Sequence, residues 1–517
     1  MKALFPTVLI ILDGWGSAPS GPGNAITLAQ LPFWTEALNK YPSTILAASG
    51  RAVGLPDNQH GNSEAGHLNI GAGRIVAQDA VRINKTIEDG RFFKNPAFLQ
   101  AFQHAERHKS RAHLMGLLTD EESGHSFPLH LSGLLKLSKE YTSVPVFLHL
   151  FTDGRDSPKY EAITYLRTVE KQLAPFQRIA TMLGRYWAMD RAKRWSRTEA
   201  AYNALVLGQG RSTAKAEQAI LLGYQRGESD EFLQATVIGQ TAKERNTSRI
   251  REGDSIIFFN FRSDRARQLT KTFMQPEFET MNPGSFRRKK TLKHVIFVAL
   301  TEFGPDLPGI LTAFPSQILR DTLPFALKGL RQLYIAESEK YAHITYFLNG
   351  GYPQPVAGED RIMIPSSNVQ SFDAEPAMQA KAITRKILSA IRAKKYDFIA
   401  VNFANADMVS HTGNLRATIQ AIQILDPCLQ RLVTGVFALG GQVVITADHG
   451  NAEIMLKHSG EIDTEHSSVP VPCIVARKNA TFRLRQKGKL ADVAPTVLDL
   501  LSRPQPRSMT GHSLIVS

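Results

Sequence analysis

Short runs of consecutive hydrophobic residues alternate along this chain with longer stretches in which hydrophobic positions recur at a helical spacing. Several of the short runs consist almost entirely of valine, isoleucine, leucine and phenylalanine, which is typical of parallel strands covered on both faces. The strands that this pattern predicts are Thr7–Leu12, Val144–Phe151, Ser255–Phe259, His294–Leu300, Asp397–Asn402, Gln442–Thr446 and Val471–Ala476.

The stretch Pro376–Ala393 illustrates the helical spacing. Pro376 suits a first helical position. Hydrophobic residues then follow close to a period of 3.6, at Met378, Ile383, Ile387, Leu388 and Ile391. Because such helices alternate with buried strands, the pattern predicts an α/β fold in which helices pack on mostly parallel sheets.

Two turn-rich segments, Gly71–Gly73 and Gly304–Gly309, mark the expected domain boundaries. The segment between them is long enough to form a domain of its own. We therefore predict a smaller inserted α/β domain over residues 78–312, and a discontinuous outer domain made of residues 1–77 and 313–517.

Composition narrows the class of protein. Hydrophobic residues make up 43% and charged residues 21% of the 517, which excludes a disordered or coiled-coil chain. The net charge of +14 suits an anionic partner such as nucleic acid, a membrane surface or a phosphorylated substrate. The only cysteines, Cys428 and Cys473, exclude a disulfide framework and thiolate metal sites, and they suit a reducing compartment.

Two alternatives concern localisation and partners. Lys2 and the apolar run behind it resemble a short signal peptide, but a buried first strand that ends at Asp13 explains the run better. No apolar stretch approaches the length of a membrane span. The basic run Arg287–Lys290 is interpreted as a solvated loop rather than a nucleic-acid contact, because Phe286 is the only aromatic residue beside it.

Acidic and histidine residues gather next to four of the predicted strands. Ligands of open α/β sheets bind outside the carboxyl ends of the strands, so these side chains converge if the strands are neighbours. Oxygen and nitrogen donors without sulfur suit two ions of Mn²⁺, Mg²⁺ or Zn²⁺. The candidate ligands are Asp13, Asp407, His411, Asp448, His449 and His466.

Ser63 is the candidate nucleophile, in the glycine-rich segment GNSEAGHLNIGAGR over residues 61–74. A bound metal would lower the pKa of its hydroxyl and make it an alkoxide nucleophile. The alternative is that Ser63 caps a helix in a glycine-rich loop. The chain contains neither a GxSxG elbow around Ser63 nor a GxxxxGK[ST] loop, which disfavours acyl transfer and nucleotide-dependent kinase chemistry.

Three arginine-rich segments, FTDGRDSP, GRYWAMDRAKRW and FFNFRSDRAR, lie in the predicted inserted domain. Arginine forks bind carboxylate and phosphate oxygens two at a time, so the segments favour a clamp for a small anion. Alternatively, about half of these arginines form structural ion pairs with Asp153, Asp190 and Asp264.

With these motifs in order, the chain resembles the cofactor-independent (2,3-bisphosphoglycerate-independent) phosphoglycerate mutases of the alkaline phosphatase superfamily over essentially its whole length. The matching motifs are ILDGWG at 11–16, GNSEAGH at 61–67, GAGRIVAQD at 71–79, FTDGRD at 151–156, GRYWAMDR at 184–191, NFRSDRAR at 260–267, AESEKYAHITYFLNGG at 336–351, NFANADMVSHTG, ADHGNAE and DVAPTVLDLL at 492–501.

The resemblance implies an isomerase that interconverts 3-phosphoglycerate and 2-phosphoglycerate through a phosphoserine on Ser63. It implies an alkaline-phosphatase-like outer domain that binds two metals, and an inserted domain that binds substrate. One metal would be held by Asp407, His411 and His466. The second would be held by Asp13, Ser63, Asp448 and His449.

For the substrate, the resemblance implies binding by His125, Arg155, Asp156, Arg185, Arg191, Arg262 and Arg265, with Lys340 near the phosphoryl group. The metals would be Mn²⁺ or Mg²⁺, and 2,3-bisphosphoglycerate would not be required. The family is cytoplasmic, glycolytic and typically monomeric, so neither nucleic acid nor a membrane is expected as a partner.

One segment departs from the family pattern. Where the family has a sequence close to SDGGVHSH, this chain has TDEESGHSF over residues 119–127, around His125. The nearest rival functions in the superfamily are a phosphopentomutase and a metal-dependent phosphatase. They would share the metal ligands but not the three arginine-rich segments.

Overall fold

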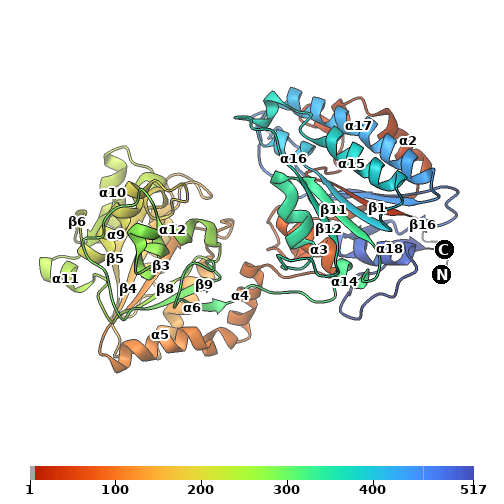
Figure 1. Cartoon of the computed structure of the whole chain (residues 1–517). Coiled ribbons are helices and arrows are strands. Elements are labelled where there is room, and N and C mark those ends of the chain that lie inside the picture. The colour runs from red at the N-terminus through yellow and green to blue at the C-terminus, as the bar shows by residue number, and fades with distance from the viewer. Residues whose placement is uncertain (1–5, 458, 517) are drawn as a thin grey trace. The chain divides into compact units, whose positions relative to one another are not determined.

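A computed structural model describes residues 6–457 and 459–516 of the chain. The chain folds into two compact units (Figure 1). Unit 1 comprises the described part of Met1–Gln78 and of Gln317–Ser517, and unit 2 comprises Asp79–Ser316. The described helices include none whose length and hydrophobicity would let it span a lipid bilayer.

Unit 1 is built on an eight-stranded sheet. Its strands in spatial order are β12 (Asp360–Ile364), β11 (Gln332–Glu337), β13 (Phe398–Phe403), β1 (Thr7–Leu12), β14 (Gln442–Thr446), β15 (Val471–Arg477), β2 (Ser43–Ala47) and β17 (Lys487–Lys489). Only β15 runs antiparallel to its neighbours. The predicted mostly parallel α/β fold is therefore confirmed.

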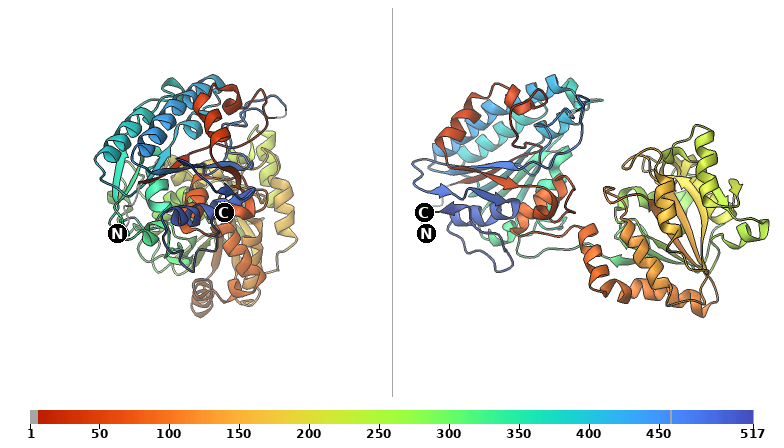
Figure 2. Two further views of the ribbon diagram at one scale, coloured as in Figure 1. Left: turned by 90° about the vertical axis from the view of Figure 1, so that its right-hand side faces the viewer. Right: turned by 180° about the vertical axis from the view of Figure 1, so that it is seen from behind.

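Helices cover both faces of this sheet. On one face lie α2 (Pro32–Lys40), α15 (Ala380–Arg392) and α17 (Leu415–Phe437), and on the other lie α3 (Ser63–Ala72) and α18 (Val493–Leu500) (Figures 1 and 2). The buried carboxylate of Asp426 in α17 accepts hydrogen bonds from the backbone N–H groups of Phe33 and Trp34. It thereby satisfies the free donors at the start of α2 and joins the two helices.

Unit 2 contains a second eight-stranded sheet, in which β5 and β7 form the antiparallel pair. Its spatial order is β10 (Leu311–Phe314), β9 (Ile296–Thr301), β8 (Ser255–Phe258), β3 (Ala112–Leu118), β4 (Val146–Thr152), β5 (Gln177–Gly184), β7 (Thr236–Ile238) and β6 (Arg211–Thr213). The longer helices of unit 2 are α4 (Asp79–Glu88), α5 (Pro96–Arg107), α6 (Pro128–Ser138), α7 (Ala162–Glu170), α9 (Trp195–Leu207), α10 (Ala216–Gln225) and α12 (Ser263–Met274).

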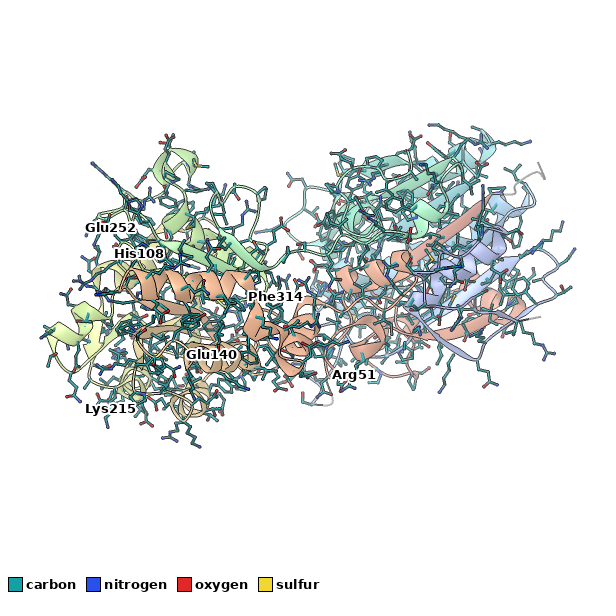
Figure 3. All side chains as sticks on the ribbon, turned by 90° about the horizontal axis from the view of Figure 1, so that it is seen from below. Arg51, His108, Glu140, Lys215, Glu252 and Phe314 are labelled. Carbon is teal, nitrogen blue, oxygen red and sulfur yellow. The ribbon has the colours of Figure 1, made fainter. Side chains whose placement is uncertain are left out.

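The turn-rich segments do not themselves divide the units. Gly71 lies within α3, and Gly73, with φ of 59°, ends that helix in the left-handed region. The Gly304–Gly309 segment joins β9 to β10 inside unit 2. Phe314 of β10, which is labelled in Figure 3, packs on Phe92 and Phe98 of the same unit. Unit 2 thus extends to Ser316, past the expected limit of residue 312, because β10 belongs to its sheet.

The helix predicted from Pro376 begins only at Ala380. Residues 376–379 form a turn in which Met378 adopts a φ of 40°, while its side chain is buried against Ala404 and Val409. Tertiary burial of Met378 therefore outweighs the helical spacing at this end of the stretch. Strands β3, β5 and β11 were not among the predicted strands.

Candidate functional site

Sheet topology brings four separate segments to one edge in unit 1. Strand β1 lies between β13 and β14 and runs parallel to both, so the residues that follow these strands meet at the same edge. They are Asp13, helix α16 (Asn405–Ser410) and Asp448. Because β15 is antiparallel to β14, His466, which precedes β15, also lies at this edge.

Ser63 is the first residue of α3, and its N-cap is Asn62, whose side chain accepts a hydrogen bond from the N–H of Ala65. The helix-cap alternative for Ser63 is therefore wrong. Gly66 allows α3 to approach this edge, because a Cβ atom at Gly66 would lie only 2.5 Å from the carbonyl oxygen of Asp448. The approach places the Ser63 hydroxyl among the candidate ligands.

The Ser63 Oγ atom contacts three ionisable side chains. It lies 2.9 Å from Lys340 Nζ, 3.2 Å from Asp13 Oδ1 and 3.0 Å from His449 Nε2. Lys340 Nζ also lies 2.6 Å from Asp13 Oδ1 and 2.6 Å from Asp407 Oδ2. A buried ammonium group thus joins the hydroxyl to two carboxylates.

Three histidine Nε2 atoms face the same carboxylates. His411 Nε2 and His466 Nε2 lie 3.3 Å and 3.4 Å from Asp407 Oδ1, and His449 Nε2 lies 3.4 Å from Asp13 Oδ1. Each ring places its Nδ1 atom at a backbone carbonyl oxygen, at distances of 2.8, 2.9 and 3.2 Å respectively. In the neutral ring this arrangement leaves the Nε2 lone pair toward the carboxylates, as in histidines that bind metals.

The charge balance of the site favours added cations. Although burial alone would raise them, Lys340 holds the pKa values of Asp13 and Asp407 well below the ordinary range. Against its own burial, the carboxylates, chiefly Asp448, raise the pKa of His449 to about 10. Asp448 Oδ2 is buried without a hydrogen-bond partner among the described residues. The donor set therefore fits divalent cations that prefer oxygen and nitrogen ligands.

The ligand atoms form overlapping groups whose spacing would let each surround an ion. Among the described residues there are three groups, and within each group the ligand atoms lie within 4.8 Å of one another. The groups are Asp407, His411 and His466; Asp13, Asp407 and His449; and Asp13, His67 and Asp448. All six candidate ligands that the sequence predicted, and Ser63, thus come together at one edge of the unit 1 sheet.

Lys340 reaches this edge from the short helical turn Ser338–Lys340, which follows β11. Glu337 ends β11; its side chain is fully buried and accepts a hydrogen bond from Ser366 Oγ. Burial raises the pKa of Glu337 to about 7, and its Oε1 atom has no hydrogen-bond partner among the described residues. The folded protein therefore holds a proton here that the unfolded chain, with a pKa of about 4.3, releases above that pH.

This difference makes the stability contribution of Glu337 fall as the pH rises from about 4.3 to about 7. In EDTA at pH 8, Glu337→Gln should increase the free energy of unfolding by about 1–3 kcal/mol, with little change at pH 4.5. Urea denaturation at the two pH values measures this effect. Glu359→Gln is the control of opposite sign, because N–H donors and Arg361 lower the pKa of Glu359 against its burial. Destabilisation by Glu337→Gln at pH 8 would contradict the expectation.

In unit 2, the predicted substrate arginines and Asp156 follow the carboxyl ends of β4, β5 and β8, and His125 follows β3. Arg185 is buried and binds two carboxylates, with its Nη1 atom 2.6 Å from Asp153 Oδ1 and 2.9 Å from Asp156 Oδ2. Arg191 and Arg262 share Asp264.

Arg265 donates to the carbonyl oxygen of Met189 at 3.4 Å. Its pKa is lowered by burial and then by the nearby charges of Arg185, Arg191 and Arg155. These four positive groups lie close together, which favours an anionic ligand.

The arginine cluster consists of Arg155, Arg185, Arg191, Arg262 and Arg265. The loop over residues 119–127, which departs from the family pattern, places His125 near this cluster. Within the loop, Ser123 Oγ donates to Asp156 Oδ2 at 3.1 Å and accepts from the N–H of His125 at 3.2 Å. Burial and then Arg185 lower the pKa of His125 to about 3, so the ring is neutral. His125 Nδ1 is buried without a hydrogen-bond partner among the described residues, and it lies 3.8 Å from Asp264 Oδ1.

Three residues of the unit 1 site were not predicted from the sequence. Asn451 Nδ2 donates to Asp407 Oδ1 at 2.9 Å, and Asn402 Nδ2 donates to Asp13 Oδ2 at 2.7 Å. His67 lies 3.2 Å from Asp448 Oδ2. The spacing of His67, four residues after Ser63, was a usable signal, because residues four apart share one face of a helix.

Comparisons with known proteins find similarity over almost the whole chain. The model of the Metalloenzyme superfamily matches residues 5–505. A Moorella thermoacetica protein named 2,3-bisphosphoglycerate-independent phosphoglycerate mutase is 47% identical over 515 residues, which cover 99% of this chain and 98% of that protein. A Methanosarcina acetivorans protein named 2,3-bisphosphoglycerate-independent phosphoglycerate mutase 2 is 46% identical over 523 residues, which cover 100% and 98%.

Among solved structures, a phosphoglycerate mutase of Leishmania mexicana, whose crystal structure was determined at low cobalt concentration, is 28% identical to this chain. The alignment covers 100% of this chain and 99% of that one, with a TM-score of 0.75.

Proposed function

Because this chain belongs to the 2,3-bisphosphoglycerate-independent phosphoglycerate mutases, we propose that it interconverts 3-phosphoglycerate and 2-phosphoglycerate with Ser63 as the phosphoryl carrier. The observation that carries this proposal is the placement of Ser63 Oγ within 3.2 Å of Lys340, Asp13 and His449, beside a buried set of candidate metal ligands. The acceptor is the protein's own hydroxyl, which explains why no bisphosphorylated cofactor is required.

The two units have different tasks in this proposal. Unit 1 carries phosphoryl transfer, since it holds Ser63 and the candidate metal ligands. Unit 2 recognises the glycerate portion through its arginine cluster, because guanidinium forks bind carboxylates in a bidentate manner. The residues assigned to the substrate are His125, Arg155, Asp156, Arg185, Arg191, Arg262 and Arg265.

Two divalent cations, Mn²⁺ or Mg²⁺, fit the ligands of unit 1. Asp407, His411 and His466 would hold one. Asp13, Ser63, Asp448 and His449 would hold the other. When bound, such ions neutralise the charge of the phosphoryl group and lower the pKa of the serine hydroxyl.

Each transfer exchanges one P–O bond for another. Ser63 Oγ bonds to phosphorus as the ester bond to the substrate oxygen breaks, and the retained glycerate then accepts the group on its other hydroxyl. Lys340, whose pKa Asp13 and Asp407 raise against its burial, stays charged and offsets the negative charge beside Ser63. The arginines hold the glycerate between the two transfers, since its release would make the enzyme a phosphatase.

A coupled assay tests the function. With enolase as the coupling enzyme and no 2,3-bisphosphoglycerate added, the protein should convert 3-phosphoglycerate, and it should leave pentose phosphates unchanged. Turnover of pentose phosphates in place of phosphoglycerate would assign a phosphopentomutase. Release of inorganic phosphate alone would assign a phosphatase.

Substrate recognition predicts the effect of a change at Arg265. Arg265→Lys keeps one positive charge but loses the planar fork, so we expect KM for 3-phosphoglycerate to rise about 10–100-fold. Steady-state kinetics in the enolase assay measures it. Arg167→Lys is the control, because Arg167 forms an exposed ion pair with Glu217. An unchanged KM in Arg265→Lys would remove Arg265 from the substrate site.

We place the enzyme in the cytoplasm as a monomer. Cys428 and Cys473 are both buried free thiols, which suits a reducing compartment. The monomer follows the family expectation, and light scattering of the purified protein tests it.

A further inference from the structure

His67 lies four residues after Ser63 in α3 and has no part in the mechanism above. Its imidazole ring is fully buried. His67 Nδ1 lies 2.9 Å from the carbonyl oxygen of Ser63 and 3.2 Å from Asp448 Oδ2. One ring therefore contacts both the backbone of the nucleophile and a candidate metal ligand.

Asn402, at the carboxyl end of β13, contacts the other side of this ring. Asn402 Nδ2 lies 2.7 Å from Asp13 Oδ2 and 3.0 Å from His67 Nε2. In the reversed amide, Asn402 Oδ1 would face the carboxylate oxygen at this distance, and two acceptors would repel each other. The amide nitrogen therefore faces Asp13, and its two hydrogens serve Asp13 and His67.

This orientation decides the tautomer of His67. Because Nε2 accepts a hydrogen bond from Asn402, the ring proton of the neutral imidazole lies on Nδ1 and is donated to the carbonyl oxygen of Ser63. Both nitrogens are then engaged. Although His67, Asp13 and Asp448 are close enough to surround an ion, His67 has no lone pair left for it.

The two carboxylate oxygens of Asp13 have different partners. Asp13 Oδ2 binds Asn402, whereas Asp13 Oδ1 faces Lys340, Ser63 Oγ and His449. We propose that His67 and Asn402 act together as positioning residues, which hold Ser63 and Asp13 in the geometry that metal binding and phosphoryl transfer require. This inference rests on the proposed function.

Two replacements of His67 separate positioning from space filling. His67→Asn keeps an N–H donor near the position of Nδ1, whereas His67→Phe keeps the ring volume and loses both hydrogen bonds. We expect Mn²⁺ affinity of the metal-free protein, followed by the electron paramagnetic resonance of free Mn²⁺, to fall about 10–100-fold in His67→Phe and less in His67→Asn. At saturating Mn²⁺, kcat should fall in the same order, with KM for 3-phosphoglycerate within about twofold of the wild type.

The opposite order would contradict the proposal, because a ring that only fills space is replaced better by phenylalanine than by asparagine. His113→Phe is the matched control. His113 is a fully buried histidine of β3 with hydrogen bonds to His149 and Asp254, and it lies in unit 2. We expect its circular dichroism and Mn²⁺ affinity to match the wild type.

The contacts that lead from Ser63 through His67 and Asn402 to Asp13 form a relay. Asn402→Leu tests this relay without altering α3. It should weaken Mn²⁺ binding about as much as His67→Phe, and the double variant should lose little more than either single one, because the two residues act through one chain of contacts. Wild-type affinity in Asn402→Leu, or additive losses in the double variant, would overturn the relay. An inactive wild-type protein would instead refute the proposed function, and the Mn²⁺ titrations would still decide the relay.

Discussion

Ser63→Ala should lower mutase activity by about 10⁴-fold or more, because the phosphoryl group then has no acceptor on the protein. The hydroxyl is the atom on which Lys340, Asp13 and His449 converge. The enolase-coupled assay measures the loss. Binding of 3-phosphoglycerate, measured by calorimetry, should persist, since the arginines of unit 2 are unchanged.

Mass spectrometry of the wild-type protein mixed with substrate should detect a phosphoryl group on Ser63 and none in the variant. Ser255→Ala is the matched control, because Ser255 is a buried serine of unit 2 whose hydroxyl donates only to the carbonyl oxygen of Ala101. Activity of Ser63→Ala above about a tenth of the wild-type value would end the phosphoserine route.

Removal of divalent cations is the second change with a large expected effect. Dialysis against EDTA should reduce activity by about 10³-fold or more, and added Mn²⁺ should restore it. The reason is electrostatic: the three buried carboxylates of Asp13, Asp407 and Asp448 outnumber the cations Lys340 and His449 before a phosphorylated substrate adds further negative charge.

The same titration identifies the metal, since Mg²⁺ and Zn²⁺ can be added in place of Mn²⁺. The melting temperature of the protein can be measured in the same titration. It should rise with Mn²⁺ concentration, because an ion that binds only the folded protein stabilises it. His411→Ala should require more Mn²⁺ for the same restoration. Full activity after exhaustive chelation would refute a metal-dependent mechanism.

Much of the unit 1 sheet could be predicted from local pattern alone. Strands β1 and β14 were predicted with the observed bounds, because each contains an uninterrupted run of valine, isoleucine or leucine that is followed within three residues by an aspartate. The edge strand β12 reads DRIMI and is half-exposed, so it gave no comparable signal. The expected helix start at Pro376 was wrong, because burial of Met378 imposes a left-handed turn before Ala380.

The order of strands in the sheet decided which neighbours the candidate ligands have. His466 precedes its strand while Asp13 and Asp448 follow theirs, and only the antiparallel direction of β15 brings His466 to the same edge. Asn402 belongs to a predicted strand. A single polar residue in a buried strand does not by itself indicate a functional role. Its contacts with Asp13 and His67 depend on the lateral pairing of β13 with β1.

The available chemistry could therefore be predicted from the residues alone: carboxylates, imidazoles and a serine near strand ends, arginines in another segment, and an α/β fold that buries the hydrophobic runs between them. These follow from local hydrophobic pattern and residue type, which act over a few positions of the chain. The three-dimensional packing was needed to show that Lys340 joins Asp13 to Asp407, that His67 donates to the backbone of Ser63, and that Asn402 orients Asp13. Such contacts join residues up to several hundred positions apart, and they are set by strand order and close packing, which no local pattern encodes.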